Sequence, residues 1–417
     1  MKEKYLVINA GSSSLKFSLY EMPEQREITN GIVEKIGEED SQYTIKFNGE
    51  KIKNIKVIKN HTEAVDVVLA ELLNYNIISS FDEIMGVGHR IVHGGEKYTE
   101  SVLITDEVIR DIEELTKFAT LHHPGNLSGI KAIQNVLPKV PMVAVFDTAF
   151  HQTMPPENYL YAVPSEWYTK YGVRKYGFHG TSHKYITEYM QDKFEDDDLN
   201  LIICHIGSGA SISAIKNGKC YDTTMGLTPL AGLVMGTRSG DIDPAVVDYM
   251  AKVKNVDSSV IMDELNLNSG LLGLATKNDC RDLEKMANEG NESAKRALEM
   301  FKLSIEKYIA EYYIKLNGKV DAIVFTAGVG ENSNTIREGI MRDLTCLGIT
   351  FDKEMNDSIA SFKEVHEGPI STEDSKIPVL VIPTNEEVMI LKDTYKISKK
   401  LEREKVKKIW LYCKKDL

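Results

Sequence analysis

Two loops of this sequence place an arginine between small residues, a combination suited to binding anions. One is Gly88-His89-Arg90-Ile91-Val92-His93-Gly94-Gly95, and the other is Met235-Gly236-Thr237-Arg238-Ser239-Gly240-Asp241. A guanidinium group matches carboxylate and phosphate oxygens bidentately, and small neighbours allow close approach. We therefore expect Arg90 and Arg238 to bind anionic ligands, although a surface or helix-cap ion pair is the alternative for each.

The histidines are concentrated in one part of the chain. Eight of the ten fall between His89 and His205. The pairs His89/His93 and His179/His183 have the i, i+4 spacing of zinc ligands on a helix, but the neighbouring glycines argue against a helix there, and no H-E-x-x-H motif is present. Zinc is therefore the less favoured interpretation, and a structural role is expected for most of these side chains.

Three turns rich in glycine and serine follow short apolar segments. They lie at residues 9–14, 205–211 and 326–332. No Walker loop occurs, and the second and third turns contain only G-x-G, without the third glycine of a dinucleotide fingerprint. Small residues can instead expose backbone N–H groups as an anion nest. Together the turns suggest a nucleotide-phosphate site, whereas each one alone could be an ordinary turn.

Carboxylates follow two other apolar segments. Asp147 comes directly after residues 142–146, and Glu386 and Glu387 follow residues 379–381 after a short polar stretch. In α/β proteins, ligands bind at the carboxyl ends of strands, and hard carboxylate oxygens suit Mg²⁺. The alternative role for these acids is helix capping.

The elements that must position these residues form a repeated pattern. Strand–turn–strand hairpins are expected over residues 6–19 and 201–215, about half a chain apart, so two similar lobes are predicted. Apolar periodicity predicts helices over 62–73, 106–118, 244–252 and 293–316, and a helix beginning near Thr335. Residues 31–60 resemble two or three short antiparallel strands. This mixture indicates an α/β protein.

Length and composition exclude several classes of protein. The chain has 417 residues, enough for two or three domains, and its formal net charge of −12 argues against a nucleic-acid binder. The five cysteines form no C-x-x-C pair, and no secretory segment or membrane span is recognised, so we expect a cytoplasmic protein without membrane contact. The basic stretch 396–417 is expected to be a solvated helix end packed through Leu401, Ile409 and Trp410; a contact with an acidic membrane or partner is the alternative.

Several segments together resemble the acetate kinase family, and the resemblance runs from Tyr5 to about Thr394. Two of them are the arginine loops quoted above. The others are Asn9-Ala10-Gly11-Ser12-Ser13-Ser14-Leu15-Lys16-Phe17, Phe146-Asp147-Thr148-Ala149-Phe150-His151 and Tyr176-Gly177-Phe178-His179-Gly180-Thr181-Ser182-His183.

The resemblance implies reversible phosphoryl transfer between ATP and acetate, giving ADP and acetyl phosphate. It implies two duplicated actin-like, sugar-kinase-like lobes of the ribonuclease H type around a nucleotide cleft. Residues 1–150 would form the first lobe, with 387–417 packing back on it, and residues 151–386 the second, which would carry most nucleotide contacts. A homodimer and Mg²⁺, for which Mn²⁺ would substitute, are also implied.

Roles for individual residues are implied by the matching motifs. Asp147, His179 and Arg238 would be catalytic, and Asn9 and Glu386 would position the metal. The substrate would be held by Arg90 and His122, with a methyl pocket formed by Val92, Leu121, Phe178 and Pro229. The nucleotide would be held by Ser12, Ser14, Lys16, His205, Ile206, Gly207, Ser208, Gly209, Asp279, Cys280, Arg281, Gly328, Val329, Gly330, Glu331 and Asn332.

The sequence departs from the family pattern at three of these places. Ser208 replaces the usual asparagine, Cys280 replaces a larger apolar residue, and Gly125 follows an otherwise familiar His-x-Pro pattern. We expect altered nucleotide affinity rather than loss of activity. Two alternatives remain open: a propionate or butyrate kinase, because one methylene changes binding by only about 1–3 kcal/mol, and an actin-like nucleotide-driven assembly protein.

Overall fold

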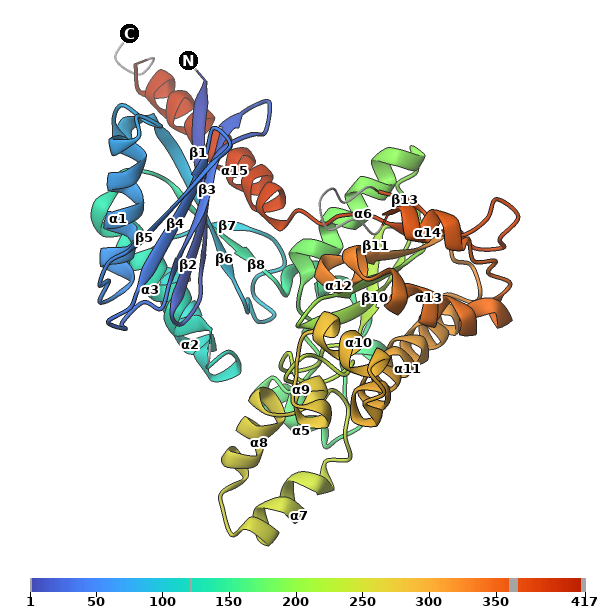
Figure 1. Ribbon diagram of the computed structural model, residues 1–417. Helices are drawn as coiled ribbons and strands as arrows, with labels where there is room; N and C mark the ends of the chain where they lie inside the picture. Colours follow the sequence, from blue (N-terminus) through green and yellow to red (C-terminus); the bar gives the residue numbers. More distant parts are fainter. Residues whose placement is uncertain (1, 121, 360–366, 414–417) are drawn as a thin grey trace. The chain divides into compact units, whose positions relative to one another are not determined.

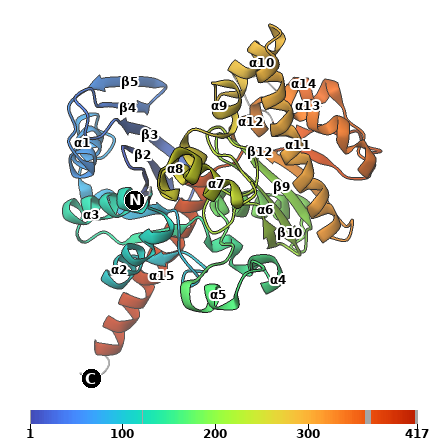
Figure 2. The same cartoon turned by 90° about the horizontal axis from the view of Figure 1, so that it is seen from below.

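The protein contains two compact units, each built on its own mixed β-sheet. The computed structural model describes residues 2–120, 122–359 and 367–413. Unit 1 comprises the described residues of Met1–Ala149 and Asn385–Leu417, and unit 2 is Phe150–Thr384 (Figures 1 and 2). Within these ranges, no helix is long and apolar enough to cross a membrane.

Unit 1 is an eight-stranded sheet with the order β5-β4-β3-β2-β1-β6-β8-β7. Its strands are β1 (Glu3–Ala10), β2 (Ser14–Met22), β3 (Arg26–Glu34), β4 (Gln42–Phe47), β5 (Glu50–Ile55), β6 (Ile84–Ile91), β7 (Val102–Leu103) and β8 (Met142–Phe146). Its helices are α1 (His61–Asn74), α2 (Asp106–Glu114), α3 (His123–Val136) and α15 (Glu386–Cys413).

Alternating side chains of β1 explain why this sheet is covered on both faces. Leu6 and Ile8 pack in a core with α1 and α3, whereas Tyr5 and Val7 pack in a second core with Ile390 of α15. Successive side chains of a strand point to opposite faces, so a continuous apolar segment requires cover on both. The C-terminal helix therefore completes the sheet with which the chain begins.

Unit 2 is a six-stranded sheet with the order β11-β10-β9-β12-β14-β13. Its strands are β9 (Leu201–Ile206), β10 (Ala210–Lys216), β11 (Lys219–Thr223), β12 (Ala322–Thr326), β13 (Gly368–Pro369) and β14 (Val379–Val381). Its helices are α4 (Pro156–Tyr159), α5 (Ser165–Tyr171), α6 (Gly180–Phe194), α7 (Ala245–Lys254), α8 (Ser258–Leu267), α9 (Gly270–Ala275), α10 (Cys280–Asn288), α11 (Glu292–Lys315), α12 (Ala327–Asn332), α13 (Asn334–Asp343) and α14 (Lys353–Ile359).

The two sheets repeat the same arrangement of four strands. In unit 1, β1 pairs antiparallel with β2 and parallel with β6, which pairs parallel with β8. In unit 2, β9 pairs antiparallel with β10 and parallel with β12, which pairs parallel with β14. The predicted repeat of two strand–turn–strand hairpins is confirmed, and the duplication extends to the strands that follow each hairpin.

Local differences from the expected elements occur around the third turn and the histidine loop. The helix expected to begin near Thr335 is confirmed as α13, which begins at Asn334, but a further helix that was not predicted, α12, begins directly after β12 at Ala327, whose φ is +65°. Gly180 was expected to prevent a helix, yet it is the first residue of α6, and His179 caps the helix with a left-handed φ of +57°. A glycine weakens a helix interior much more than a helix end.

Three buried histidines should make the stability of the protein sensitive to mild acid. Burial lowers the pKa of His89 and His93 to about 3 and that of His183 well below its usual value. In the unfolded chain each takes up a proton below a pKa of about 6.5. The contribution of these histidines to the free energy of unfolding should therefore be fully present above that pH and be lost below it. The loss should be about 1.4 kcal/mol per histidine between about pH 7.5 and about pH 5.5.

Urea unfolding of the wild type and of His89→Leu at both pH values measures this effect. The variant should lose less stability on acidification than the wild type, whatever its stability at neutral pH. An equal loss in both proteins would contradict the prediction.

Candidate active site

Charged side chains gather where the parallel strands of unit 1 end. Arg90 lies near the end of β6, Asp147 follows β8, and Glu386 begins α15. The Nε atom of Arg90 lies 3.0 and 3.1 Å from the two carboxylate oxygens of Asp147, and Nη2 lies 2.7 Å from Oδ2. Glu386 Oε2 lies 3.8 Å from Arg90 Nε. Asp147 and Glu386, which lie 57 and 296 positions after Arg90 in the sequence, thus reach one point, because the carboxyl ends of parallel strands share a sheet edge.

The charges at this edge strongly influence one another. The Asp147 side chain is 2% exposed, whereas those of Arg90 and Glu386 are 22% and 21% exposed. Burial alone would lower the pKa of Arg90, but the carboxylates of Asp147 and Glu386 raise it. Burial also raises the pKa of Glu386 to about 7; Arg90 opposes this shift, and Asp147 adds to it. The edge therefore carries more negative charge than one guanidinium can balance.

Such an edge fits a divalent cation. Asn9 and Glu386 offer amide and carboxylate oxygens, the hard ligands that Mg²⁺ prefers, and a cation would relieve the repulsion that raises the pKa of Glu386. Across the described ranges, no group of three or more His, Cys, Asp or Glu side chains could hold a metal by itself. This arrangement suits Mg²⁺, which usually takes one or two carboxylates together with substrate phosphates.

Two glycines of β6 let α15 bring Glu386 to the sheet. A Cβ atom on Gly88 would overlap Thr394 Oγ1 and lie 2.6 Å from Ile390 Cγ2, and one on Gly86 would lie 2.8 Å from Ser398 Oγ. Larger residues at these positions would push the helix away. These two glycines thus position the helix that begins with the predicted metal ligand.

The first glycine-rich turn, between β1 and β2, is held from below by α1 and α3. Asn126 donates from Nδ2 to the carbonyl of Ala10 at 2.7 Å and accepts from the backbone N–H of Val92 at 3.2 Å. His61 Nε2 lies 2.7 Å from the carbonyl of Gly11. Ser12 and Lys16 remain exposed, so the turn presents its polar groups to a ligand.

Gly125 permits the closest approach between α3 and this turn. A Cβ atom there would overlap the carbonyl of Gly11 and lie 3.1 Å from the backbone nitrogen of Ser12. We expect Gly125→Ala to destabilise the protein by about 1–3 kcal/mol, the usual cost of overpacking, and to raise the KM for ATP. Urea unfolding and steady-state kinetics measure the two effects, and Gly368→Ala, on β13, where a Cβ atom would only make an ordinary contact with Ile359 at 3.4 Å, controls for loss of a glycine. Unchanged kinetics in Gly125→Ala would contradict the proposed link to the turn.

In unit 2, His179 and Arg238 meet beside the second glycine-rich turn. A Cβ atom on Gly209 would lie 3.5 Å from both His179 Nε2 and Arg238 Nη1. Arg238 donates to the carbonyl of Pro229 at 3.1 Å, and burial lowers the pKa of its guanidinium. No carboxylate pairs with it among the residues that the structure describes. A half-buried cation without a carboxylate partner among the described residues, beside a turn of small residues, is a suitable site for an anion.

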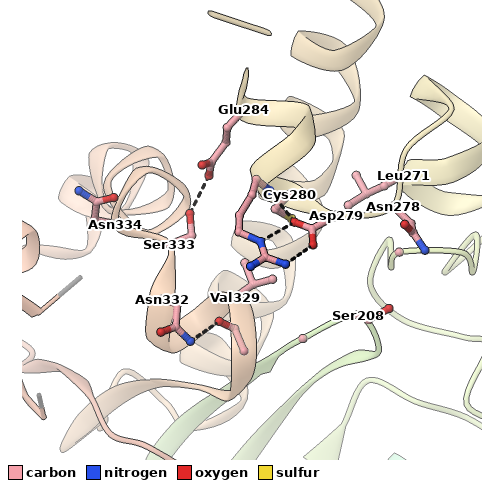
Figure 3. A pocket seen from close by; sticks show the side chains of 14 residues that line it. Ser208, Leu271, Asn278, Asp279, Cys280, Glu284, Val329, Asn332, Ser333 and Asn334 are labelled. Atoms are coloured by element: carbon pink, nitrogen blue, oxygen red, sulfur yellow. Dashed lines mark hydrogen bonds and ion pairs between the residues drawn. The ribbon is translucent and has the colours of Figure 1, made fainter. Parts of the chain in front are cut away.

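A cavity of about 400 Å³ adjoins this turn within unit 2 (Figure 3). It is lined by Gly207, Ser208, Gly236, Leu271, Asn278, Asp279, Cys280, Arg281, Glu284, Gly328, Val329, Asn332, Ser333 and Asn334. Most of the residues predicted to hold the nucleotide in this unit are therefore brought together here. The volume lies within the range of small-molecule sites.

The side chains of this cavity are arranged by the start of α10. Asp279 accepts from the backbone N–H of Arg281 at 2.9 Å, and the Arg281 guanidinium folds back onto the same carboxylate (Figure 3). The hydrogen bond from Arg281 is the main reason that the pKa of Asp279 is lowered. Burial raises the pKa of Cys280 to about 12, so its thiol stays protonated and contributes an apolar surface.

A buried arginine that sequence reasoning missed anchors the third turn. Arg337 is fully buried in α13 and donates to the carbonyls of Gly330 and Glu331 at 2.9 and 2.8 Å, and to Asn356 Oδ1 at 2.8 Å. Its charge lies against the last carbonyls of α12, where the helix dipole favours a cation. Nothing in the sequence distinguishes this residue from the exposed arginines of other helices.

The remaining predicted residues have varied positions. Ile206 is buried, and the carboxylate of Glu331 accepts from the backbone N–H groups of Ala327 and Thr384. His205 stacks on His179 with ring centroids 4.2 Å apart. Of the predicted methyl pocket, Val92 belongs to unit 1, Phe178 and Pro229 belong to unit 2, and Leu121 lies outside the described residues. His122 precedes the first residue of α3.

Comparison with known proteins decides the family. The model of the acetokinase family matches residues 4–392. The chain belongs to the acetokinase family. It is 53% identical to the acetate kinase of Geobacillus sp. (strain WCH70) over 398 residues, 95% of this chain and 99% of that one. It is 50% identical to the acetate kinase of Bacillus subtilis (strain 168), over 95% of this chain and 100% of that one.

Solved structures give the same assignment. The acetate kinase of Porphyromonas gingivalis has a TM-score of 0.89 and 45% identity, covering 95% of this chain and 99% of its own. A propionate kinase from Francisella tularensis has a TM-score of 0.90 and 39% identity, covering 95% and 100%. As an acetokinase-family member, the chain is a kinase that transfers phosphate to a carboxylate, and its fold is the duplicated α/β architecture expected from the sequence.

Proposed function

We propose that this protein interconverts ATP and acetate with ADP and acetyl phosphate. The observation that carries the proposal is Arg238, which has no carboxylate partner among the described residues and lies beside Gly209, as His179 does, with a cavity of about 400 Å³ adjoining the same turn. The acetate kinases of Geobacillus, Bacillus subtilis and Porphyromonas gingivalis to which the chain is similar support acetate as the acceptor.

The chemistry demands positive charge rather than a base. Acetate is already ionised at neutral pH because its pKa is near that of other carboxyl groups, about 4. Two unit charges about 4 Å apart repel by roughly 4 kcal/mol at an effective dielectric constant of 20. In our proposal Arg90 attracts the acceptor carboxylate, while Arg238 and His179 stabilise the charge on the phosphoryl group during transfer.

The acids of unit 1 would orient the reactants. Asp147 binds the edge of the Arg90 guanidinium formed by Nε and Nη2, and the proposed role of Asp147 is to orient the substrate or the metal. Asn9 and Glu386 would hold Mg²⁺, which neutralises phosphate charge when bound. Transfer would be direct and in line, without a covalent enzyme phosphate, so net inversion at a chiral phosphorus is expected and net retention would contradict it.

Each unit would carry a different part of this work. We assign the acceptor and metal residues to the N-terminal lobe and most nucleotide contacts to the C-terminal lobe, with Lys16, Ser12 and Ser14 contributing from the first turn. Lys16 already influences the pKa of Glu386, which places its positive charge near the proposed metal ligand.

A hydroxamate assay tests the activity. Purified protein with ATP, Mg²⁺, hydroxylamine and acetate should form acetyl hydroxamate, with a higher kcat/KM for acetate than for propionate or butyrate. A preference for propionate would replace the proposed acceptor with that of the Francisella relative. ATP-dependent filaments without any hydroxamate would instead favour an assembly protein.

We also propose that the protein works as a homodimer in the cytoplasm. Helix α7 contains no buried residue, and it exposes Tyr249 and Val253 by 65% and 60%. Figure 1 shows α7 and α8 projecting from the rest of unit 2. A second copy of the chain would cover this apolar face. The formal net charge of −12 does not favour nucleic acid as a partner. Light scattering should show a dimer, and Tyr249→Glu should produce a monomer.

A further inference from the structure

A serine of β10 joins two histidines near the second glycine-rich turn. Ser211 Oγ lies 2.9 Å from His179 Nδ1 and 2.9 Å from His183 Nε2. Ser211 and His183 are both fully buried. A hydroxyl group has one proton, so Ser211 can donate to only one of these nitrogens and must accept from the other.

The surroundings of His183 decide the direction of the two hydrogen bonds made by Ser211. Burial lowers the pKa of His183 well below its usual value, so the ring is neutral and carries one proton. Its Nδ1 atom is buried and has no hydrogen-bond partner in the part of the chain that the structure describes. A buried N–H without an acceptor is rarer and more costly than a buried lone pair. The proton therefore belongs on Nε2, which donates to Ser211.

The direction of these hydrogen bonds decides which ring nitrogen of His179 carries the proton. Because Ser211 accepts from His183, its own O–H donates to His179 Nδ1. We infer that His183 and Ser211 are positioning residues that hold neutral His179 as the tautomer with its proton on Nε2. Nε2 is the atom that lies beside Gly209 and Arg238. His179 therefore presents an N–H donor to an anion at the turn without needing a positive charge.

This arrangement matters because Arg238 offers only donors. A guanidinium beside an imidazole would by itself favour a lone pair on the facing nitrogen, and that lone pair would repel a phosphoryl oxygen. The hydrogen bonds from His183 to Ser211 and from Ser211 to His179 oppose a lone pair on His179 Nε2. Their catalytic consequence rests on the proposed function, whereas the tautomer itself does not.

The tautomer can be measured directly by NMR. Long-range ¹H–¹⁵N correlation spectra of the full-length protein labelled with ¹⁵N-histidine should show a protonated Nε2 and an unprotonated Nδ1 for His179, assigned with His179→Gln. In Ser211→Ala the ring should become a mixture of tautomers. A protonated Nδ1 in the neutral wild-type ring, or an unchanged pattern in Ser211→Ala, would overturn the inference.

Kinetics provide the second readout, with a matched control on the same strand. Ser213 is also fully buried on β10, two residues further along, and its hydroxyl donates to Thr223 instead. Ser211→Ala should lower kcat about tenfold and leave the KM for ATP within about twofold, whereas Ser213→Ala should leave kcat unchanged. Ser211→Thr, which keeps the hydroxyl, should recover most of the rate. Equal losses in both alanine variants would show a purely structural role. Absence of transfer in the wild type would reject the proposed function and leave the NMR result to decide the tautomer.

Discussion

Arg238→Ala should lower kcat for phosphoryl transfer by about 10³- to 10⁵-fold, the range found when an arginine that stabilises a transferring phosphoryl group is lost. The side chain lies beside Gly209, and its one strong hydrogen bond within the described ranges goes to the carbonyl of Pro229. Its charge is therefore available to an anion. The KM for ATP should change much less than kcat, because the interaction strengthens as charge develops on the phosphoryl group.

Two variants complete this experiment. Arg238→Lys keeps the charge but loses the planar fork, so its rate should lie between those of the alanine variant and the wild type. Arg342→Ala removes an exposed arginine that pairs with Glu338 in the same unit, and it should leave kcat unchanged. An Arg238→Ala enzyme that retains a tenth of the wild-type kcat would contradict the assigned role.

Asp147→Asn should lower kcat by at least about 10²-fold, the loss expected when a reacting group is misplaced by about 1 Å. The wild-type carboxylate receives three hydrogen bonds from Arg90 and is almost completely buried. An amide would keep the shape but lose the charge, so the guanidinium would turn toward Glu386. The hydroxamate assay and substrate saturation measure the change.

A double-mutant cycle separates a shared role from two independent ones. If Arg90 and Asp147 act as a unit, the double variant Arg90→Ala/Asp147→Asn should be scarcely slower than the slower single variant. The exposed ion pair of Lys131 with Glu113, also in unit 1, is the matched control, and its removal should change neither kcat nor KM. If the fold-losses in kcat of the two single variants multiply in the Arg90–Asp147 double variant, the two residues act separately.

Most strands and the repeat could be predicted from local patterns. Short apolar segments interrupted by glycine and serine gave both hairpins at the right places, because turn chemistry and period-two alternation are encoded within a few residues. The helix starting at Ala327 could not be predicted in this way. It follows β12 without a capping side chain and depends on Arg337, which binds its last carbonyls from another helix.

The site was predictable in its residue types but not in its pairing. Arginine among glycines indicated anion binding, yet the sequence could not show that Arg90 would pair with Asp147, because sheet order decides which strand ends meet. Likewise, the i, i+4 spacing of His179 and His183 did not show that both side chains would lie beside Ser211. They do so because His179 is the N-cap of α6 and His183 lies in the first turn of that helix. The packing of Gly125 against Gly11 also depends on tertiary contact.

The position of α15 has a consequence for synthesis on the ribosome. Tyr5, Val7, Val143 and Val145 form one face of the first sheet, and their cover begins only at residue 386. At about 5–20 residues per second, this face waits roughly 10–50 s after residue 149 is made. During that interval unit 2 is synthesised while this apolar face of the nascent chain remains exposed. Chaperones that bind apolar segments should therefore bind the first 149 residues and dissociate once α15 packs on the sheet.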